Sequence, residues 1–182
     1  MLPFRAGFDS FSVRYLEWLH KRDAEGWRYE SGELALEHDD ARLEGMQLHG
    51  RIDRVDTHAE SGALQLVDYK TGSAQALRSK VAEPLEDTQL AFYAALLAQG
   101  EAAAPVRAIY LALDDRNPPK EIEHPDVATS AEQLIEGLAV DLMELRAGAG
   151  LPALGEGVVC DFCEARGLCR RDHWSASSPH LQ

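Results

Sequence analysis

The chain has 182 residues, of which 45% are hydrophobic and 27% are charged. This composition is typical of one globular domain with its own apolar core, and it excludes a collagen, a coiled coil and a disordered chain. The 18 basic and 31 acidic side chains give a formal net charge of −13. Such an acidic chain is not expected to bind nucleic acid by phosphate neutralisation alone, so local motifs have to overturn that expectation.

Targeting signals are not evident. The N-terminus lacks the apolar stretch of a signal peptide, and no apolar run approaches the ~20 residues that cross a bilayer. All three cysteines lie between residues 160 and 169, whereas a secreted disulfide framework spreads an even number of cysteines along the chain. We therefore expect a reducing, cytoplasmic location and no membrane partner.

The first part of the sequence predicts a helix followed by three strands. Aromatic and leucine residues recur at helical spacing over residues 7–25, and Gly26 is expected to end this helix. Alternation predicts a strand over residues 33–38. The segments 46–56 and 63–70 are joined by a short loop containing Ser-Gly and are expected to form a β-hairpin.

The second part predicts further strands and helices after a polar loop over residues 73–86. Asp87 is expected to cap a helix over residues 88–99. The remaining elements are expected at residues 106–113 (a buried strand), 120–124 (a short edge strand) and 130–147 (an amphipathic helix). This order of elements predicts an α/β fold in which a mixed sheet is flanked by helices.

Three charged residues are expected to converge at one edge of the sheet. Asp53 lies in the first strand of the hairpin, and Asp68 and Lys70 lie near the end of the second. Residues two apart on a strand share a face, and hairpin pairing can bring Asp53 beside them. A divalent cation relieves the repulsion between two carboxylates, and a lysine beside it stabilises charge on a phosphoryl oxygen. The alternative is a structural ion pair.

The segment GRIDRVDTHAESGALQLVDYKTG, residues 50–72, resembles the PD-(D/E)xK nuclease superfamily. It is most similar to the RecB-type nuclease domains, which include AddB-type helicase–nuclease subunits and CRISPR-associated exonucleases. The resemblance implies a restriction-endonuclease-like α/β core in which Asp53 and Asp68 bind Mg²⁺ or Mn²⁺ and Lys70 is catalytic. It also implies a metal contact from the backbone carbonyl of Tyr69. The implied reaction is hydrolysis of DNA phosphodiester bonds by an exonuclease-like enzyme of DNA repair or recombination.

The helix after the hairpin extends the resemblance. Its start, Asp-Thr-Gln-Leu-Ala-Phe-Tyr, is similar to the Q-x-x-x-Y motif of the family, with Gln89 and Tyr93 in the motif positions. Residues four apart share one helix face, so the amide and the hydroxyl can both be directed at the sheet edge. There they can bind a DNA phosphate or hold the lysine, and the alternative is a buried polar pair.

Further residues near the motif have weaker support. Glu37 fits loosely the acidic residue that often precedes the first metal-binding strand of the family, and the alternative is a surface glutamate. Arg51 and Arg54 are expected to orient carboxylates or contact phosphate, with surface ion pairs as the alternative. His49 belongs to no motif, and we interpret it as structural.

The cysteines form a C-x2-C-x5-C pattern through Cys160, Cys163 and Cys169, a spacing that suggests a metal or an iron–sulfur site. AddB-type nucleases carry a similar trio with a fourth cysteine far upstream, and together these hold a [4Fe–4S] cluster. This sequence has no fourth cysteine. A metal-contacting histidine of the family's N-terminal helix is not evident either, because the surroundings of His20 differ. A zinc site completed by His173 is the alternative.

These departures predict a C-terminal piece of a longer protein or a degenerate member of the family. We expect a nuclease domain over residues 1–147, with the cysteine-containing segment 148–182 packing on it. A helicase-like region or partner subunit of the parent protein is expected to deliver DNA. Two other functions stay open: an inactive nuclease-fold module with a structural or DNA-gripping role, and a metal-binding interaction module built around the cysteines.

Overall fold

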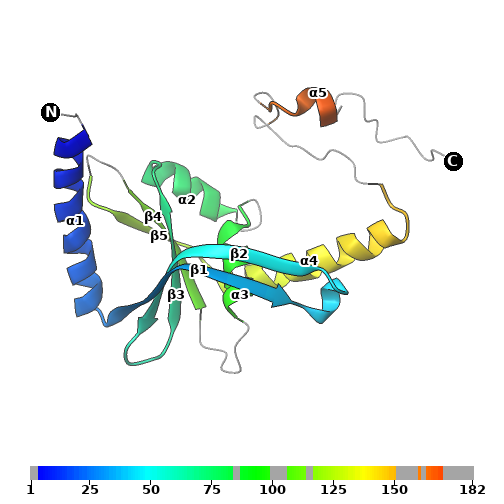
Figure 1. Ribbon diagram of the computed structural model, residues 1–182, viewed down its shortest axis with the longest axis horizontal. Coiled ribbons are helices and arrows are strands. Elements are labelled where there is room, and N and C mark those ends of the chain that lie inside the picture. The colour runs from blue at the N-terminus through cyan, green and yellow to red at the C-terminus, as the bar shows by residue number, and fades with distance from the viewer. Residues whose placement is uncertain are drawn as a thin grey trace. The chain divides into compact units, whose positions relative to one another are not determined.

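A computed structural model of the chain describes residues 4–83, 87–98, 106–113, 117–150, 160 and 163–169 (Figure 1). The strands are β1 (Trp27–Asp39), β2 (Gln47–His58), β3 (Leu64–Lys70), β4 (Val106–Ala112) and β5 (Lys120–Glu123). The helices are α1 (Phe4–Ala24), the 3-10 turn η1 (Ala41–Leu43), α2 (Ala74–Ala82), α3 (Gln89–Leu97), α4 (Val127–Arg146) and α5 (Arg166–Cys169). The chain divides into two compact units, residues 1–139 and residues 140–182, and the first contains the whole sheet.

The five strands form one mixed sheet in the order β1-β2-β3-β4-β5. β1, β2 and β3 pair antiparallel in sequence, β3 and β4 pair parallel, and β5 returns antiparallel to β4. Parallel neighbours require a crossover connection, and this one contains α2 and α3. The expected α/β fold, a restriction-endonuclease-like core with helices flanking a mixed sheet, is confirmed.

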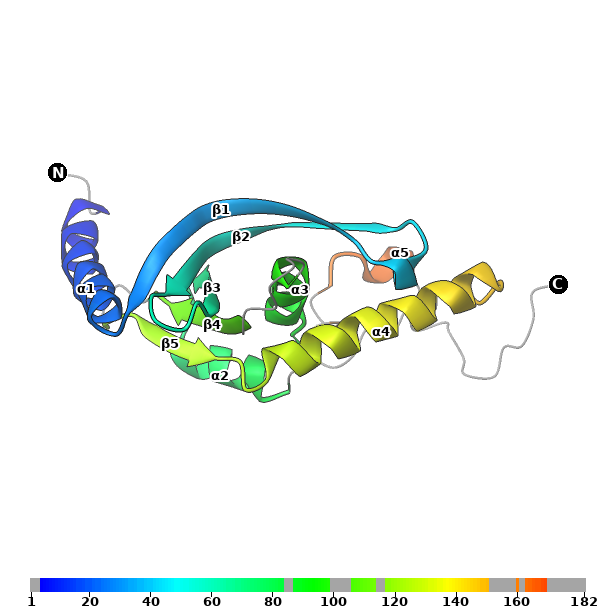
Figure 2. The ribbon, with the colours of Figure 1, turned by 90° about the horizontal axis from the view of Figure 1, so that it is seen from below.

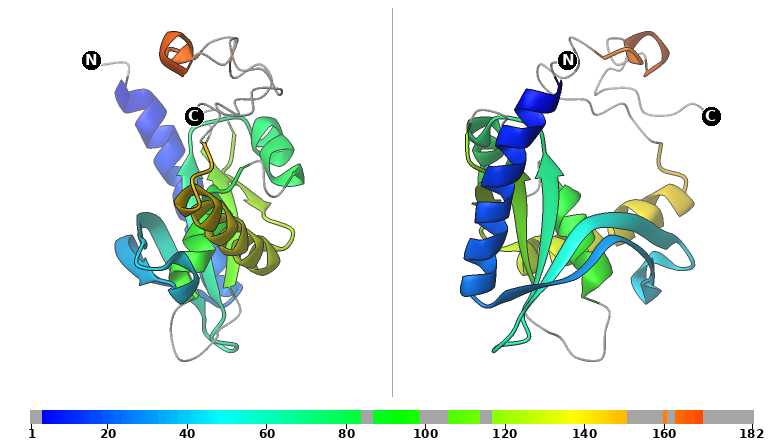
Figure 3. Two further views of the ribbon diagram at one scale, coloured as in Figure 1. Left: turned by 90° about the vertical axis from the view of Figure 1, so that its right-hand side faces the viewer. Right: turned by 60° about the vertical axis from the view of Figure 1, so that its left-hand side comes forward.

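Helices cover both faces of the central strands. On one face Trp18 of α1 packs against Val67 of β3 and against Ile109 and Leu111 of β4. α3 packs on the other face, and the long strands β1 and β2 curve over it (Figure 2). Because successive side chains of a strand alternate, Tyr69 points toward α1, while Asp68 and Lys70 point toward α3. Two further views show the same two layers (Figure 3).

α3 approaches β2 closely at Gly50. A Cβ atom at this position would lie 2.7 Å from Cδ1 of Leu96, 3.2 Å from Cε1 of Phe92 and 3.4 Å from Cε1 of Tyr93. Real Cβ atoms are essentially never found as close as the first of these distances. The glycine of the sequence GRID therefore lets the helix that carries Gln89 and Tyr93 lie against the strand that carries Asp53.

The expectation of a polar loop over residues 73–86 is wrong for most of that segment. Residues 74–82 form α2, whose N-cap is Ser73, because the serine hydroxyl accepts a hydrogen bond from the backbone N of Ala76. Leu77 and Val81 lie four residues apart and are both buried, so they give the helix an apolar stripe that the polar composition conceals.

Other boundaries shift by a few residues. β1 begins at Trp27 rather than at residue 33. Its pairing with β2 shifts register between Tyr29 and Ser31, and the φ of Glu33 is 51°. Both irregularities disturb the alternation of side chains on which the predicted start relied. The N-cap of α3 is Thr88 rather than Asp87, whose carboxylate instead accepts a hydrogen bond from the backbone N of Gln89. The predicted helix after residue 130 begins at Val127.

The second unit contains the end of α4, a turn in which Gly148 has a φ of +95°, and α5. Residues 151–159 lie outside the described residues. The expected division at residue 147, with the later segment packing on the nuclease domain, stays a prediction. Within the described ranges, no helix combines the length and the apolar character needed to cross a lipid bilayer.

Candidate active site

The two aspartates meet where the pairing of β2 with β3 stops. Arg54 pairs with Val67, so the next step of the same register places Asp53 opposite Asp68. Asp53 Oδ2 accepts a hydrogen bond of 2.9 Å from the backbone N of Tyr69, the residue that follows Asp68. The side chain of Asp53 thus continues the ladder after the backbone of β2 has diverged from β3, and it lies against the peptide bond that follows the second carboxylate.

Lys70 and Gln89 close a ring of contacts around Asp68. Nζ of Lys70 lies 2.7 Å from Asp68 Oδ2 and donates a hydrogen bond of 2.8 Å to Oε1 of Gln89. Nε2 of the same amide donates to Asp68 Oδ1 at 2.8 Å and to the hydroxyl of Tyr93 at 3.4 Å. The structure therefore brings together five of the residues selected from the sequence, Asp53, Asp68, Lys70, Gln89 and Tyr93.

The environment of Asp68 disfavours its negative charge. Its side chain is 2% exposed, and burial raises its pKa. Lys70 lowers the pKa of this carboxyl, whereas the negative charges of Asp53 and Asp87 raise it, and the pKa ends above its ordinary value. One ammonium group therefore does not compensate the two or three carboxylates gathered here.

Oδ2 of Asp68 provides the test of whether a divalent cation fits. Asp68 Oδ2 is buried, and despite the nearby ammonium it has no hydrogen-bond partner of regular geometry among the described residues. In the part of the chain that the structure describes, no group of three or more His, Cys, Asp or Glu side chains is placed to hold a metal. Two carboxylates suffice for Mg²⁺, which keeps several waters and substrate oxygens as its other ligands. The donor set fits such an ion.

The backbone of Tyr69 is oriented toward the two acids. The carbonyl of Lys70 accepts a hydrogen bond of 2.8 Å from the backbone N of Leu113, so the peptide groups of Lys70 face β4. Because these directions alternate along a strand, those of Tyr69 face β2, where its N–H meets Asp53. Its carbonyl points to the same side, and its role as a metal ligand stays a prediction.

Glu37 lies apart from this cluster. It is an exposed residue of β1 and pairs with His49 of β2. His49 precedes Asp53 by four residues, which is about 13 Å along a strand. His49 is also exposed. The structure thus gives Glu37 no place beside the carboxylates of Asp53 and Asp68.

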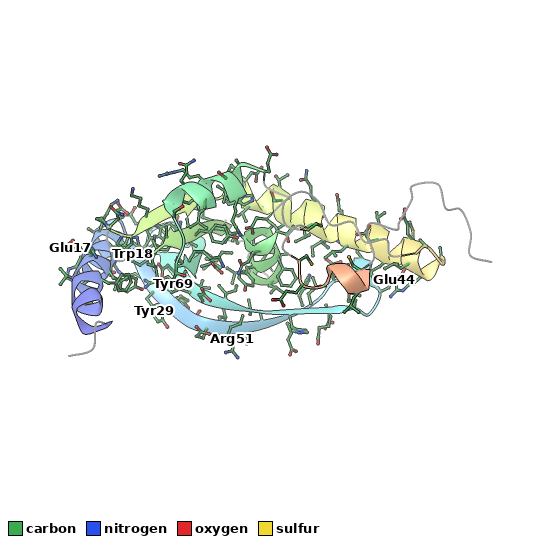
Figure 4. The ribbon with its side chains drawn as sticks, turned by 90° about the horizontal axis from the view of Figure 1, so that it is seen from above. Glu17, Trp18, Tyr29, Glu44, Arg51 and Tyr69 are labelled. Atoms are coloured by element: carbon green, nitrogen blue, oxygen red, sulfur yellow. The ribbon has the colours of Figure 1, made fainter. Side chains whose placement is uncertain are left out.

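The two arginines of the GRIDR segment do not contact the carboxylates of Asp53 and Asp68 in the described residues. Arg51 is mostly exposed on the β1–β2 ribbon, and its Nη1 lies 3.7 Å from Glu33 Oε2, which is the surface ion pair considered as the alternative (Figure 4). Arg54 is buried and turns toward α1, where its Nε donates to Asp56 Oδ1 at 2.6 Å. Arg54 thus orients a carboxylate, but that of Asp56 rather than those of Asp53 and Asp68, and a phosphate contact of either arginine stays a prediction.

Three residues that the sequence did not reveal as part of the site support it: Lys80, Asp87 and Tyr110. Asp87 Oδ1 accepts hydrogen bonds from the Tyr110 hydroxyl at 2.6 Å and from the backbone N of Gln89 at 3.3 Å, and its Oδ2 accepts from Lys80 at 2.7 Å. Burial raises the pKa of Asp87, but hydrogen bonds from Lys80 and Tyr110 lower it below its ordinary value. Lys70 Nζ also lies 5.3 Å from the ring centroid of Tyr110.

The sequence contains little that could have revealed this support. Tyr110 lies inside an apolar strand run and is indistinguishable there from a core residue. Asp87 was recognised only as a helix cap, although it is two residues from the Gln89 that it helps to hold.

The cysteine segment belongs to the second unit. Cys160 is partly buried, Cys163 and Cys169 are exposed, and the backbone N of Cys163 donates a hydrogen bond of 3.4 Å to the carbonyl of Cys160. The alternative zinc ligand His173 lies outside the described residues. An iron–sulfur or zinc site at these cysteines stays a prediction.

A mixed sheet that presents two carboxylates and a lysine at a strand end, with a glutamine on the crossover helix, defines a nuclease fold of the restriction-endonuclease type. The family model of the PD-(D/E)XK nuclease superfamily matches residues 6–170, and the chain belongs to this superfamily. Nucleases of this superfamily generally use divalent metal ions such as Mg²⁺ or Mn²⁺.

The crystal structure of a protein named SSO0001 is similar, with 20% sequence identity and a TM-score of 0.36. The match covers 86% of this chain and 66% of that chain, so this chain spans just under two thirds of that protein's length. No match was found among curated proteins.

Proposed function

We propose that this chain is a metal-dependent deoxyribonuclease domain that hydrolyses phosphodiester bonds and acts from DNA ends. The observation that carries the proposal is the meeting of Asp53 and Asp68 at one strand end, with the ammonium group of Lys70 2.7 Å from the second carboxylate. An ordinary ion pair between Lys70 and Asp68 leaves unexplained the second acid, Asp53, beside it. A bound Mg²⁺ or Mn²⁺ accounts for both carboxylates.

Each side chain of the site has a separate role in phosphodiester hydrolysis. Asp53, Asp68 and the carbonyl of Tyr69 would hold the ion, which supplies an activated water and polarises the phosphate. Gln89 holds Lys70 and one oxygen of Asp68 at once, so the ammonium and the carboxylate keep a fixed geometry. Lys70, 28% exposed, is then positioned to stabilise the negative charge that develops on the phosphoryl oxygen. Tyr93 extends the polar surface toward the DNA strand.

We further propose that the chain works within a larger RecB- or AddB-like protein of DNA repair or recombination. The net charge of −13 gives it little long-range attraction for DNA. A helicase-like region or subunit that grips DNA supplies the missing affinity and delivers the strand to the nuclease site.

A nuclease assay with matched variants tests the site. The chain is incubated with linear DNA and Mg²⁺ or Mn²⁺, and Asp68→Asn and Lys70→Ala are compared with Asp141→Asn and Lys120→Ala, which change exposed residues of the same types. We expect cleavage to fall about a hundredfold or more in the first two variants, because each loses a group that stabilises the transition state. The control variants should keep wild-type rates, and equal rates in all four variants would refute the site.

Two additional measurements sharpen the result. Covalently closed circular DNA is resistant to an enzyme that needs DNA ends. If the chain cleaves it as fast as linear DNA, the exonuclease part of the proposal is contradicted, while the nuclease part stands. Calorimetric titration with Mn²⁺ should show binding to the wild type and none to Asp68→Asn. Without metal, Asp68→Asn is expected to be at least as stable as the wild type, because it removes a charge that burial and neighbouring acids disfavour.

A further inference from the structure

A partly buried polar network lies on the face of the sheet opposite the two acids. The hydroxyl of Tyr15, on α1, lies 2.8 Å from the hydroxyl of Tyr69 on β3. The same Tyr15 oxygen accepts a hydrogen bond of 3.4 Å from Nη1 of Arg54 on β2. Tyr69 directly follows Asp68, and Arg54 directly follows Asp53. One hydroxyl of α1 therefore contacts the residue next to each of the two carboxylates.

Tyr15 is itself held firmly. Its ring centroid lies 5.9 Å from that of Phe11 and 5.3 Å from that of Trp18, and its ring packs edge-on against Tyr69. Trp18, also on α1, packs into the core against β3 and β4, and Figure 4 shows it close to Tyr69. Such packing leaves the Tyr15 hydroxyl little freedom to move away from its two partners.

Charged side chains fix α1 to the sheet around this hydroxyl. Asp56 is fully buried and accepts hydrogen bonds from Arg54 on one oxygen and from Arg22 of α1 on the other, at 2.6–2.9 Å. Arg22 also donates to Glu121 of β5 at 3.1 Å. The helix and the strand of Asp53 are thus joined through the buried Arg22 and Asp56, and the exposed Glu121 links Arg22 to the far edge of the sheet. Loss of either buried partner leaves the charge of the other unpaired.

We propose that Tyr15 is a positioning residue of the metal site and acts through Tyr69. Tyr69 presents its side chain to α1, while its backbone N–H points toward β2 and donates a hydrogen bond of 2.9 Å to Asp53. The hydroxyl contact therefore sets the orientation of the peptide that holds one carboxylate and directly follows the other. This inference rests on the proposed nuclease function and extends the set of residues on which metal binding depends to the helix before the sheet.

Hydroxyl-deletion variants test the inference. Tyr15→Phe and Tyr69→Phe each remove one partner of the same hydrogen bond and keep the ring, and the double variant completes the cycle. The readout is the Mn²⁺ dissociation constant from calorimetry on the whole chain, with the Mn²⁺ dependence of DNA cleavage beside it. We expect each single variant to bind Mn²⁺ about three- to tenfold more weakly, as for the loss of one hydrogen bond. The double variant should be no weaker than the weaker single variant, because both changes break one contact.

Tyr29→Phe is the matched control. The ring of Tyr29 lies 5.3 Å from the guanidinium of Arg54, and the side chain is 62% exposed. The variant therefore loses a hydroxyl near the same arginine without touching Tyr15 or Tyr69, and its Mn²⁺ affinity should equal that of the wild type.

The outcomes separate this inference from the proposed function. A wild-type chain that neither binds Mn²⁺ nor cuts DNA refutes the nuclease proposal itself. A wild type that does both, beside a Tyr15→Phe variant with a lower melting temperature but an unchanged Mn²⁺ dissociation constant, shows that Tyr15 stabilises the fold only and overturns the inference. If Tyr15→Phe does not fold, the Mn²⁺ affinity of Tyr69→Phe decides in the same way.

Discussion

Asp68 combines two properties that are separately unfavourable, because it is a charged residue in the interior and it lies beside other acids. Its surroundings contain one ammonium group, one amide and two further carboxylates. Strand periodicity was enough to predict that Asp68 and Lys70 share a face, since their spacing of two residues decides it. The contribution of Gln89 needed the family motif, because nothing in local periodicity says which helix face meets the sheet.

The hydrogen-bond partner of Arg54 could not be predicted from its place in the motif. Its position one residue after Asp53 suggested a role in orienting carboxylates, yet its hydrogen-bonded acid is Asp56, on the same strand. The second partner of that acid is Arg22, which is 34 residues away in sequence and reaches it only because α1 packs on this face. Contacts made through tertiary packing cannot be predicted from the spacing of residues in a motif.

Asp40 permits a prediction about pH. Its carboxylate accepts hydrogen bonds from the side chain and the backbone N of Arg42, and the side-chain bond above all lowers the pKa of Asp40 to about 2. The unfolded value is close to 3.8, so the stability that ionised Asp40 contributes is complete above pH 4 and is lost as the pH falls toward 2. We expect Asp40→Asn to be less stable than the wild type at pH 6, with a difference that shrinks between pH 4 and pH 2.

Urea unfolding of both proteins at pH 6, 4, 3 and 2 measures this difference. A difference in unfolding free energy that is the same at every pH would show that the ionisation of Asp40 contributes nothing.

At the scale of elements, the sequence predicted regular segments well and irregular ones poorly. The hairpin follows from two strand segments joined by a short Ser-Gly loop, and the strand at residues 106–113 follows from its apolar composition. The structure has them within two residues of the expected bounds. β1 was predicted at half its length, because the register shift after Tyr29 and the left-handed conformation of Glu33 disrupt the alternation on which the prediction relied. α2 was missed because only Leu77 and Val81 form its buried stripe.

The packing of α3 on β2 makes Gly50 a sensitive position. We expect Gly50→Ala to destabilise the fold by about 1–3 kcal/mol, because the added methyl group meets Leu96 and Phe92 and the helix has to move away. Nuclease activity should fall as well, since Tyr93 lies on the displaced face. Gly137→Ala in α4 is the control, with no atom within 4 Å of the added Cβ. In a helix interior it should stabilise by roughly 0.5–1 kcal/mol.

Chemical unfolding of the two alanine variants beside the wild type gives both values. Equal stability of Gly50→Ala and the wild type would mean that α3 adjusts freely and that its contact with β2 does not fix the position of the motif residues.

At the scale of the whole molecule, charge sets how the chain meets DNA. With a net charge of −13, we expect weak binding when the chain is alone, and at least tenfold tighter binding by a longer protein that adds a DNA-gripping region. Fluorescence anisotropy with end-labelled DNA at one fixed salt concentration, with EDTA present to prevent cleavage, measures both affinities. Equal affinities would count against a separate source of DNA binding.

The fold class could be inferred from the order of elements, because a hairpin followed by helices and a further apolar strand has few arrangements other than a mixed sheet. The strand order and the parallel pairing of β3 with β4 depend on contacts between distant segments, and the sequence alone did not supply them.

That parallel pair has a consequence for how the protein matures. The hairpin that carries Asp53 and Asp68 closes over a short loop, but β4 reaches β3 only after the intervening chain has crossed the sheet. Gln89 and Tyr93 lie within that connection, so their position beside the acids depends on the pairing of β3 with β4. We therefore expect a chain whose hairpin has formed but whose β4 has not paired to lack the amide that orders its acids, and to lack nuclease activity.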